Sequence, residues 1–162
     1  MTTNEKVNLE RLTTSLQKCR IHLQRLQYAV GQTEKLFPLE REIYQGLDDA
    51  QIGNIDQLVF RFTKLQDEVG TNTFRYVLVY LQEDILDKPF RDILNRLERL
   101  NIIDSSDTWL ALRELRNDLA HEYPMMPEET IDKLNHLFVQ LPVLENIFIT
   151  IERLVKQLTN IQ

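Results

Sequence analysis

Apolar residues recur every three or four positions along most of the chain. In the first such segment, Asn8 to Phe37, they are Leu9, Leu12, Leu16, Cys19, Leu23, Leu26 and Val30. This spacing places them on one face of a helix. Pro38 cannot continue the helix, because its ring removes the backbone N–H and clashes with the preceding turn. The pattern predicts one long amphipathic helix that ends before Pro38.

The next segment predicts a short helical piece that is broken near Gly46 and Gly53. Apolar spacing resumes after it, at Leu58, Phe62, Leu65 and Val69. The run TFRYVLVYLQE, residues 73–83, is β-branched and aromatic enough for a strand, but a single strand has no partner here. We therefore expect a buried helix that continues the preceding one, with a kink at Gly70.

Three more helices are predicted in the second half. One has Pro89 at its first position, where a missing N–H costs nothing. The next is capped by side-chain oxygens of residues 104–107 (DSSD) and ends before Pro124. The last begins at Pro127, whose following acids suit the helix dipole, and runs almost to position 162 with a kink at Pro142.

Composition agrees with this pattern. The chain has 162 residues with only 4 Gly and 5 Pro, which favours long helices with few turns. We find no internal repeat or interdomain linker. The expected fold is a single all-α domain, residues 1–162, built as a mostly antiparallel bundle of roughly five helices.

Charge and apolar content limit the partners and the location. The net charge of −6 argues against a broad nucleic-acid surface, so any RNA contact has to be local. We find no run of about eighteen apolar residues and no signal-like start, and therefore expect a cytoplasmic protein that does not enter a membrane. The lone Cys19 fits a small buried thiol. His22, His121 and His136 lack metal-ligand spacing, so no metal site is expected.

The stretch LRELRNDLAHEYP, residues 112–124, carries the candidate chemistry. On a helical wheel Arg116 falls on the apolar face, beside Leu112 and Tyr123. A guanidinium there needs a partner, because it cannot lose its charge. His121 lies one turn after Asn117, which could fix the tautomer of its imidazole. Around the helix axis, His121 is about 140° from Arg116. A two-fold dimer would bring two copies of both residues to one cleft.

These residue types suit metal-free cleavage of RNA. A neutral imidazole can accept the 2′-hydroxyl proton, and a guanidinium can stabilise the pentacoordinate phosphate. The products would be a 2′,3′-cyclic phosphate and a 5′-hydroxyl. A structural interpretation also fits, since basic and aromatic residues near a helix C-terminus stabilise the dipole and pack on the core. Spacing alone favours that structural interpretation.

The order Arg116-Asn117-x-x-x-His121-x-Tyr123 resembles the signature of the HEPN domain family, in particular the HepT-like toxins of HEPN/MNT toxin–antitoxin pairs, also labelled nucleotidyltransferase substrate-binding proteins. Two further segments are similar to that family. IDQLVFRFTKLQDEVG, residues 55–70, resembles the helix with its Arg-aromatic pair, here Arg61 and Phe62, and residues 88–104 resemble the connecting helix.

The resemblance implies a dimeric all-α bundle that acts as a metal-independent endoribonuclease on tRNA or mRNA and needs no cofactor of its own. Arg116 and His121 would be the catalytic pair, and Asn117 would shape the site. Tyr123 matches the position at which the partner antitoxin, a nucleotidyltransferase that uses ATP and magnesium, attaches AMP. A phosphate on this phenol would compete for Arg116, which lies on nearly the same helix face.

Two other functions stay open. A non-catalytic helical adaptor could bind a nucleotidyltransferase or present its substrate, and a purely structural bundle would leave Arg116 unexplained. Arg61, Arg75 and Arg91 could line an RNA groove, but ion pairs on helix surfaces explain them equally well.

Overall fold

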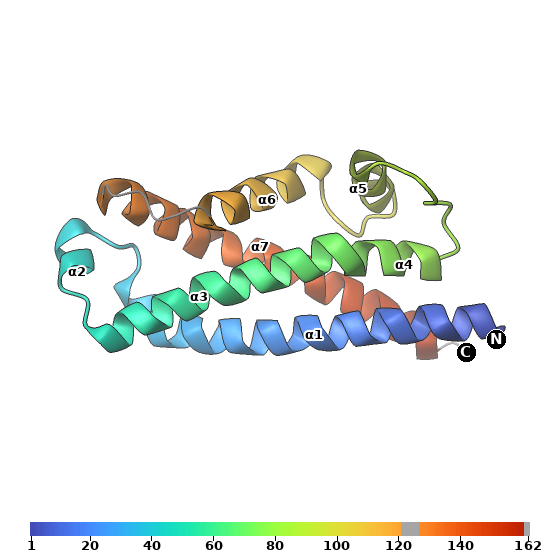
Figure 1. Cartoon of the computed structure of the whole chain (residues 1–162), viewed down its shortest axis with the longest axis horizontal. Coiled ribbons are helices and arrows are strands. Elements are labelled where there is room, and N and C mark those ends of the chain that lie inside the picture. The colour runs from blue at the N-terminus through green and yellow to red at the C-terminus, as the bar shows by residue number, and fades with distance from the viewer. Residues whose placement is uncertain (121–126, 161–162) are drawn as a thin grey trace.

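The computed structural model describes residues 1–120 and 127–160, and every regular element in them is helical (Figure 1). The helices are α1 (Thr3–Thr33), η1 (Glu34–Leu36), α2 (Arg41–Gln45), α3 (Asp49–Glu68), η2 (Val69–Thr73), α4 (Phe74–Tyr80), α5 (Phe90–Arg99), α6 (Ser106–Ala120) and α7 (Pro127–Asn160). Because α3, η2 and α4 follow one another without a break, they form one long rod. The all-α prediction is confirmed for the described residues.

Helix α1 is longer at its start and shorter at its end than the apolar pattern predicted. It begins after Thr2, whose hydroxyl accepts a hydrogen bond from the Glu5 N–H at 3.2 Å, while the Glu5 carboxylate accepts one from the Thr2 N–H at 2.6 Å. Such a reciprocal cap adds a polar turn that apolar spacing cannot reveal. At the other end the chain tightens into the 3₁₀ turn η1 after Thr33, so the α-helix stops before Phe37.

The predicted break at Gly46 is confirmed, whereas the break at Gly53 is wrong. Gly46 follows α2, but Gly53 lies inside α3. A glycine inside a helix costs only about 1 kcal/mol. That cost is offset by the cap at Asp48, which accepts from the Gln51 N–H at 2.8 Å, and by the buried apolar face that begins at Ile55.

The kink expected at Gly70 takes the form of a π-helical turn, η2, in the middle of the rod. The run at 73–83 is helical as predicted up to Tyr80, with Phe74, Val77 and Leu78 buried in α4, and residues 81–83 lie beyond the helix. The π-turn is held from inside by Thr73, whose hydroxyl lies 2.8 Å from Ser15 Oγ and 3.5 Å from Cys19 Sγ. Single π-turns of this kind occur frequently at functional sites.

Helices α5, α6 and α7 lie close to their predicted positions. Pro89 caps α5 just before its first residue, and α7 begins at Pro127 as predicted. The start of α6 is fixed by Ser105, whose hydroxyl accepts from the Thr108 N–H at 3.0 Å. It is also fixed by Glu98, which accepts from the Ser106 N–H at 3.0 Å.

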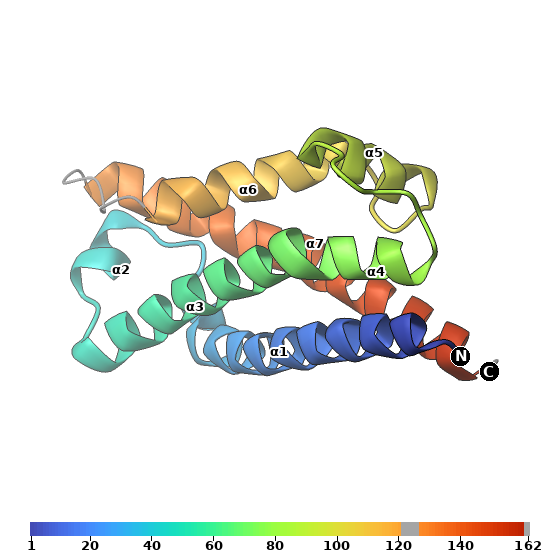
Figure 2. The same cartoon turned by 45° about the vertical axis from the view of Figure 1, so that its right-hand side comes forward.

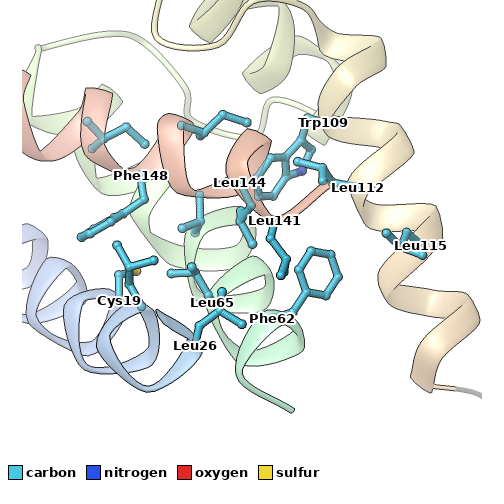
Figure 3. Close-up of a cluster of buried hydrophobic side chains, with 14 of the residues drawn as sticks. Cys19, Leu26, Phe62, Leu65, Trp109, Leu112, Leu115, Leu141, Leu144 and Phe148 are labelled. Atoms are coloured by element: carbon cyan, nitrogen blue, oxygen red, sulfur yellow. The ribbon is translucent and has the colours of Figure 1, made fainter. Parts of the chain in front are cut away.

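The helices pack around one core. Helix α3 lies between α1 and α6, and α7 runs diagonally behind them from the α6 side to the N-terminal end of α1 (Figures 1 and 2). Side chains from α1, α3, α6 and α7 meet between these helices (Figure 3). Cys19 is fully buried among them, as predicted, and burial raises the pKa of its thiol to about 12.

Helix α7 is long and apolar enough, by length and composition alone, to cross a membrane. Its buried side chains include Leu134, Leu144 and Phe148, which pack inside the bundle. The core helix of a bundle has the same composition as a membrane span, so this property is weak evidence for a membrane. The cytoplasmic location stays a prediction.

Candidate functional site: an arginine-lined groove beside the π-turn

A groove of about 430 Å³ opens where the π-turn and the end of α3 face α6 and the start of α5. It is lined by Gln66, Asp67, Gly70, Thr71, Arg75, Phe90, Trp109, Arg113, Arg116 and Asn117. Three arginines and one aspartate therefore give the groove a net charge of +2, in a chain whose net charge is −6. The groove concentrates positive charge at one place in an acidic protein.

Arg116 is held by Asp67 across the gap between α6 and α3. Its Nε donates to Asp67 Oδ1 at 2.7 Å, and its Nη2 donates to Oδ2 at 2.8 Å. This two-point contact fixes the plane of the guanidinium. The hydrogen bonds that Arg116 donates to the Asp67 carboxylate raise the pKa of Arg116 above its ordinary value. Arg116 thus has the partner that its place on the apolar face requires, and 28% of its side chain remains accessible.

Asn117 contacts the same guanidinium from its other side. Its Oδ1 accepts a hydrogen bond from Arg116 Nη1 at 3.3 Å. Five N–H bonds belong to the guanidinium, and the contacts to Asp67 and Asn117 use three of them. Among the described residues, one N–H on each Nη atom has no partner. The site-shaping role of Asn117 stays a prediction.

Arg113 and Arg75 bring two further positive charges to the groove. The Arg113 guanidinium lies over the Phe90 ring, 5.2 Å from its centroid. Neither Arg113 nor Arg75 forms a salt bridge within residues 1–120 and 127–160. Both charges face the groove without an acidic partner in this part of the chain, and Phe90 adds an aromatic wall.

The indole of Trp109 forms part of the groove wall and leaves no room for a side chain at Gly70. A Cβ atom on Gly70 would lie 2.8 Å from Trp109 Cζ2. The indole is fully buried and meets the Phe74 ring edge to face at 4.5 Å. Its Nε1 is buried and has no hydrogen-bond partner among the described residues. The lack of a side chain at Gly70 lets the π-turn approach the ring.

The predicted site residues divide into two groups. Arg116 and Asn117 line the groove together, whereas His121 and Tyr123 lie outside the described residues. In the sequence His121 directly follows Ala120, the last residue of α6. The Arg116–His121 pair and the place of Tyr123 stay predictions.

Of the three other arginines considered for the groove, only Arg75 lines it. Arg91 lies 3.9 Å from Asp107 in a surface ion pair, and Arg61 contacts His22 on α1. Sequence reasoning missed Asp67 entirely. Its carboxylate resembles any other acid on an exposed helix face, and only the packing of α3 against α6 brings it to Arg116.

Within residues 1–120 and 127–160 no cluster of three or more His, Cys, Asp or Glu side chains could hold a metal ion. Comparison of the chain with protein-family models, with curated proteins and with solved structures gives no match. The resemblance to HEPN proteins therefore rests on the motif from Arg116 to Tyr123 and the two segments described above.

Proposed function

We propose that the protein is a metal-independent endoribonuclease of the HEPN type and the toxin of a HEPN/MNT toxin–antitoxin pair. The observation that supports this proposal is the arginine-lined groove, in which the motif residue Arg116 is oriented by Asp67 and stands beside Arg113 and Arg75. Arginines arranged in this way bind phosphate oxygens through planar, charged N–H groups. The substrate would be RNA, with tRNA first and mRNA second.

The reaction would transfer the scissile phosphate within the RNA strand. The ribose 2′-oxygen attacks the phosphorus and loses its proton to a base, the P–O5′ bond breaks, and the 5′-oxygen receives a proton. His121 would serve as base or acid. The two N–H bonds of Arg116 that Asp67 and Asn117 leave unused would stabilise the negative charge on the pentacoordinate phosphate.

A second copy of the chain would complete the site. Arg116 and His121 are about 140° apart on a regular helix, so one helix does not readily direct both at one phosphate. A two-fold pairing of the α6 helices would place Arg116 of each copy near His121 of the other. The proposed active unit is therefore a homodimer.

The partner would be a nucleotidyltransferase antitoxin that uses ATP and magnesium to attach AMP to Tyr123. The added phosphate would occupy the same arginines that bind RNA. Mass spectrometry after incubation with partner and ATP should find AMP on Tyr123. Label on another residue, with Tyr123 unmodified, would reject this site.

Cleavage of tRNA in EDTA tests the catalytic proposal. We expect wild type to leave 2′,3′-cyclic phosphate ends, and His121→Ala and Arg116→Ala to lower the rate at least about 100-fold. Arg153→Ala is the matched control, because it removes an exposed arginine on α7, outside the groove. Intact tRNA with wild type, or equal rates for wild type and His121→Ala, would refute the proposal.

A non-catalytic adaptor for a nucleotidyltransferase is the second candidate. The observation that favours it is the Asp67 carboxylate, which already neutralises Arg116 within one chain. If the protein is an adaptor, the partner enzyme should bind the Arg116→Ala and His121→Ala variants as tightly as it binds the wild-type protein. Isothermal titration of the partner into these variants separates the two candidates when combined with the cleavage assay.

A further inference from the structure

A second cluster of positive and aromatic side chains lies on the outer side of α3, next to α1. Phe60 is 47% exposed, although it is a large apolar residue on a helix surface. The Arg61 guanidinium lies 5.2 Å and the Lys64 ammonium 5.6 Å from the centre of its ring. We call Phe60, Arg61 and Lys64, together with His22 of α1, the Phe60 patch.

The charges of the Phe60 patch are not neutralised by ion pairs. Arg61 Nη1 lies 3.0 Å from His22 Nδ1, so its close polar contact is an imidazole and not a carboxylate. Its Nε is buried and has no hydrogen-bond partner in the described part of the chain. Neither Arg61 nor Lys64 takes part in a salt bridge within residues 1–120 and 127–160.

Charged groups of both signs lie near the patch. Lys18 and Arg25 are exposed on α1, one turn before and one turn after His22. On α3 the acids within one turn are Asp56, before Phe60, and Asp67 and Glu68, after Lys64. Asp67 is paired with Arg116. Glu68 already accepts hydrogen bonds from Ser15 at 2.8 Å and Asn72 at 3.0 Å. The four basic residues Lys18, Arg25, Arg61 and Lys64 exceed the three acids Asp56, Asp67 and Glu68 by one positive charge.

The Phe60 patch continues the wall of the groove. At about 100° per residue, Phe60, Lys64 and Asp67 fall within an arc of about 60° on α3, and the rise from Phe60 to Asp67 is about 10 Å. Asp67 is the residue that holds Arg116 in the groove. Helices α1, α3 and α6 lie side by side (Figure 1). The short rise along α3 would let one extended ligand reach both places.

We propose that the Phe60 patch binds single-stranded RNA that extends beyond the groove, with a base stacked on Phe60 and a phosphate held by Arg61 and Lys64. Positive charge beside an exposed aromatic ring is the arrangement by which proteins bind single strands without reading sequence. An acidic protein partner would use the charges but not the ring. The role of the Phe60 patch as an extension of the substrate site rests on the proposed ribonuclease function. Binding of single-stranded RNA by the patch does not depend on that function.

The experiment measures affinity with a fluorescent single-stranded oligonucleotide of twelve 2′-O-methyl nucleotides, which cannot be cleaved because its 2′-oxygens are blocked. Phe60→Ala should weaken binding about tenfold through lost stacking. Lys64→Gln should lower the slope of log K against log salt by about 0.7, which is one phosphate contact. The controls are Leu86→Ala, which truncates another exposed apolar residue, and Lys35→Gln, which removes another exposed charge.

Two further oligonucleotides sharpen the result. On a strand with abasic sugars, Phe60→Ala should bind like wild type, while Lys64→Gln should stay weakened. A dinucleotide that fills only the groove should bind all variants equally. Equal affinity of wild type, Phe60→Ala and Lys64→Gln for the twelve-nucleotide strand would overturn the proposal. The proposal would also be overturned if Phe60→Ala lost as much affinity for the abasic strand as for the strand with bases, because that loss could not come from stacking.

Failure of the ribonuclease proposal would look different. In that case wild type leaves tRNA intact, yet the 2′-O-methyl strand still binds and the Phe60→Ala loss remains. Conversely, the wild type could cleave tRNA while the patch variants bind the strand as tightly as wild type. That result would reject the RNA-binding role of the Phe60 patch and support the ribonuclease proposal. Tighter binding of poly-glutamate than of the RNA strand would assign the patch to an acidic protein and overturn the RNA proposal.

Discussion

Gly70→Ala gives a quantitative test of the contact between the π-turn and Trp109. A Cβ at position 70 would lie 2.8 Å from Trp109 Cζ2, whereas carbon atoms in contact prefer at least about 3.5 Å. The indole or the π-turn must therefore move by roughly 0.7 Å. Trp109 has no exposed surface and already packs on Phe74, so the shift disturbs the core. Overpacking of this kind costs about 1–3 kcal/mol.

Gly53→Ala is the matched control for that substitution. Gly53 also lies in the rod formed by α3 to α4, and no atom lies within 4 Å of a Cβ placed there. Alanine is favoured over glycine in helices by about 1 kcal/mol, and this gain acts on both variants. The difference between them isolates the overpacking. We expect Gly70→Ala to be less stable than Gly53→Ala by about 2 kcal/mol, or roughly 4–8 °C in Tm.

Urea unfolding followed by tryptophan fluorescence measures this difference directly, because the chain has one Trp and that residue is buried. A second arm uses Trp109→Leu as background, where the smaller side chain removes the obstacle. In that background Gly70→Ala should match Gly53→Ala, read by circular dichroism. A Gly70→Ala protein as stable as Gly53→Ala in the wild-type background would refute the reasoning.

Three other predictions concern groups outside the groove. Burial, and next a neighbouring arginine, lower the pKa of His22 below 6.5. The unfolded chain then binds the proton first, so stability should fall as pH drops below about 6.5, and His22→Gln, unlike exposed His136→Gln, should flatten this slope in urea titrations. Cys19, with its pKa raised to about 12 by burial, should react with a thiol reagent only as the protein unfolds, and rapid labelling of native protein would contradict this. Asn135→Ala should cost about 1–3 kcal/mol in urea unfolding, because Asn135 bonds the Leu39 N–H at 2.6 Å and the Leu39 carbonyl at 2.9 Å; an unchanged midpoint would show that this loop is not anchored there.

Apolar periodicity predicted most of the helices because each element buries one face. Leu58, Phe62, Leu65 and Val69 are all fully buried, as their spacing indicated. The errors occur where polar or backbone effects determine the boundary. The start of α1 depends on a cap, and the passage of α3 through Gly53 depends on the packing of residues on both sides.

The site was less predictable than the fold. The wheel showed that Arg116 needs a partner, but nothing in the pattern selects Asp67, which lies 49 positions earlier in the chain. Arg75 reaches the groove only because α4 continues the rod beyond the π-turn. Residues on different helices converge through tertiary packing, and one sequence does not contain that distance information.

The π-turn adds one residue to the rod beyond what a continuous α-helix would contain. Counting from Val69, an uninterrupted α-helix would bury positions 72, 73 and 76, whereas the structure buries Thr73, Phe74 and Val77. The apolar sequence of α4 is thus offset by one position from that of α3. Removal of one residue within η2 would bring the two faces back into phase as a plain helix. We expect this deletion to alter the wall of the groove, which Gly70 and Thr71 of η2 line. In this rod the additional residue lies in the turn that borders the groove.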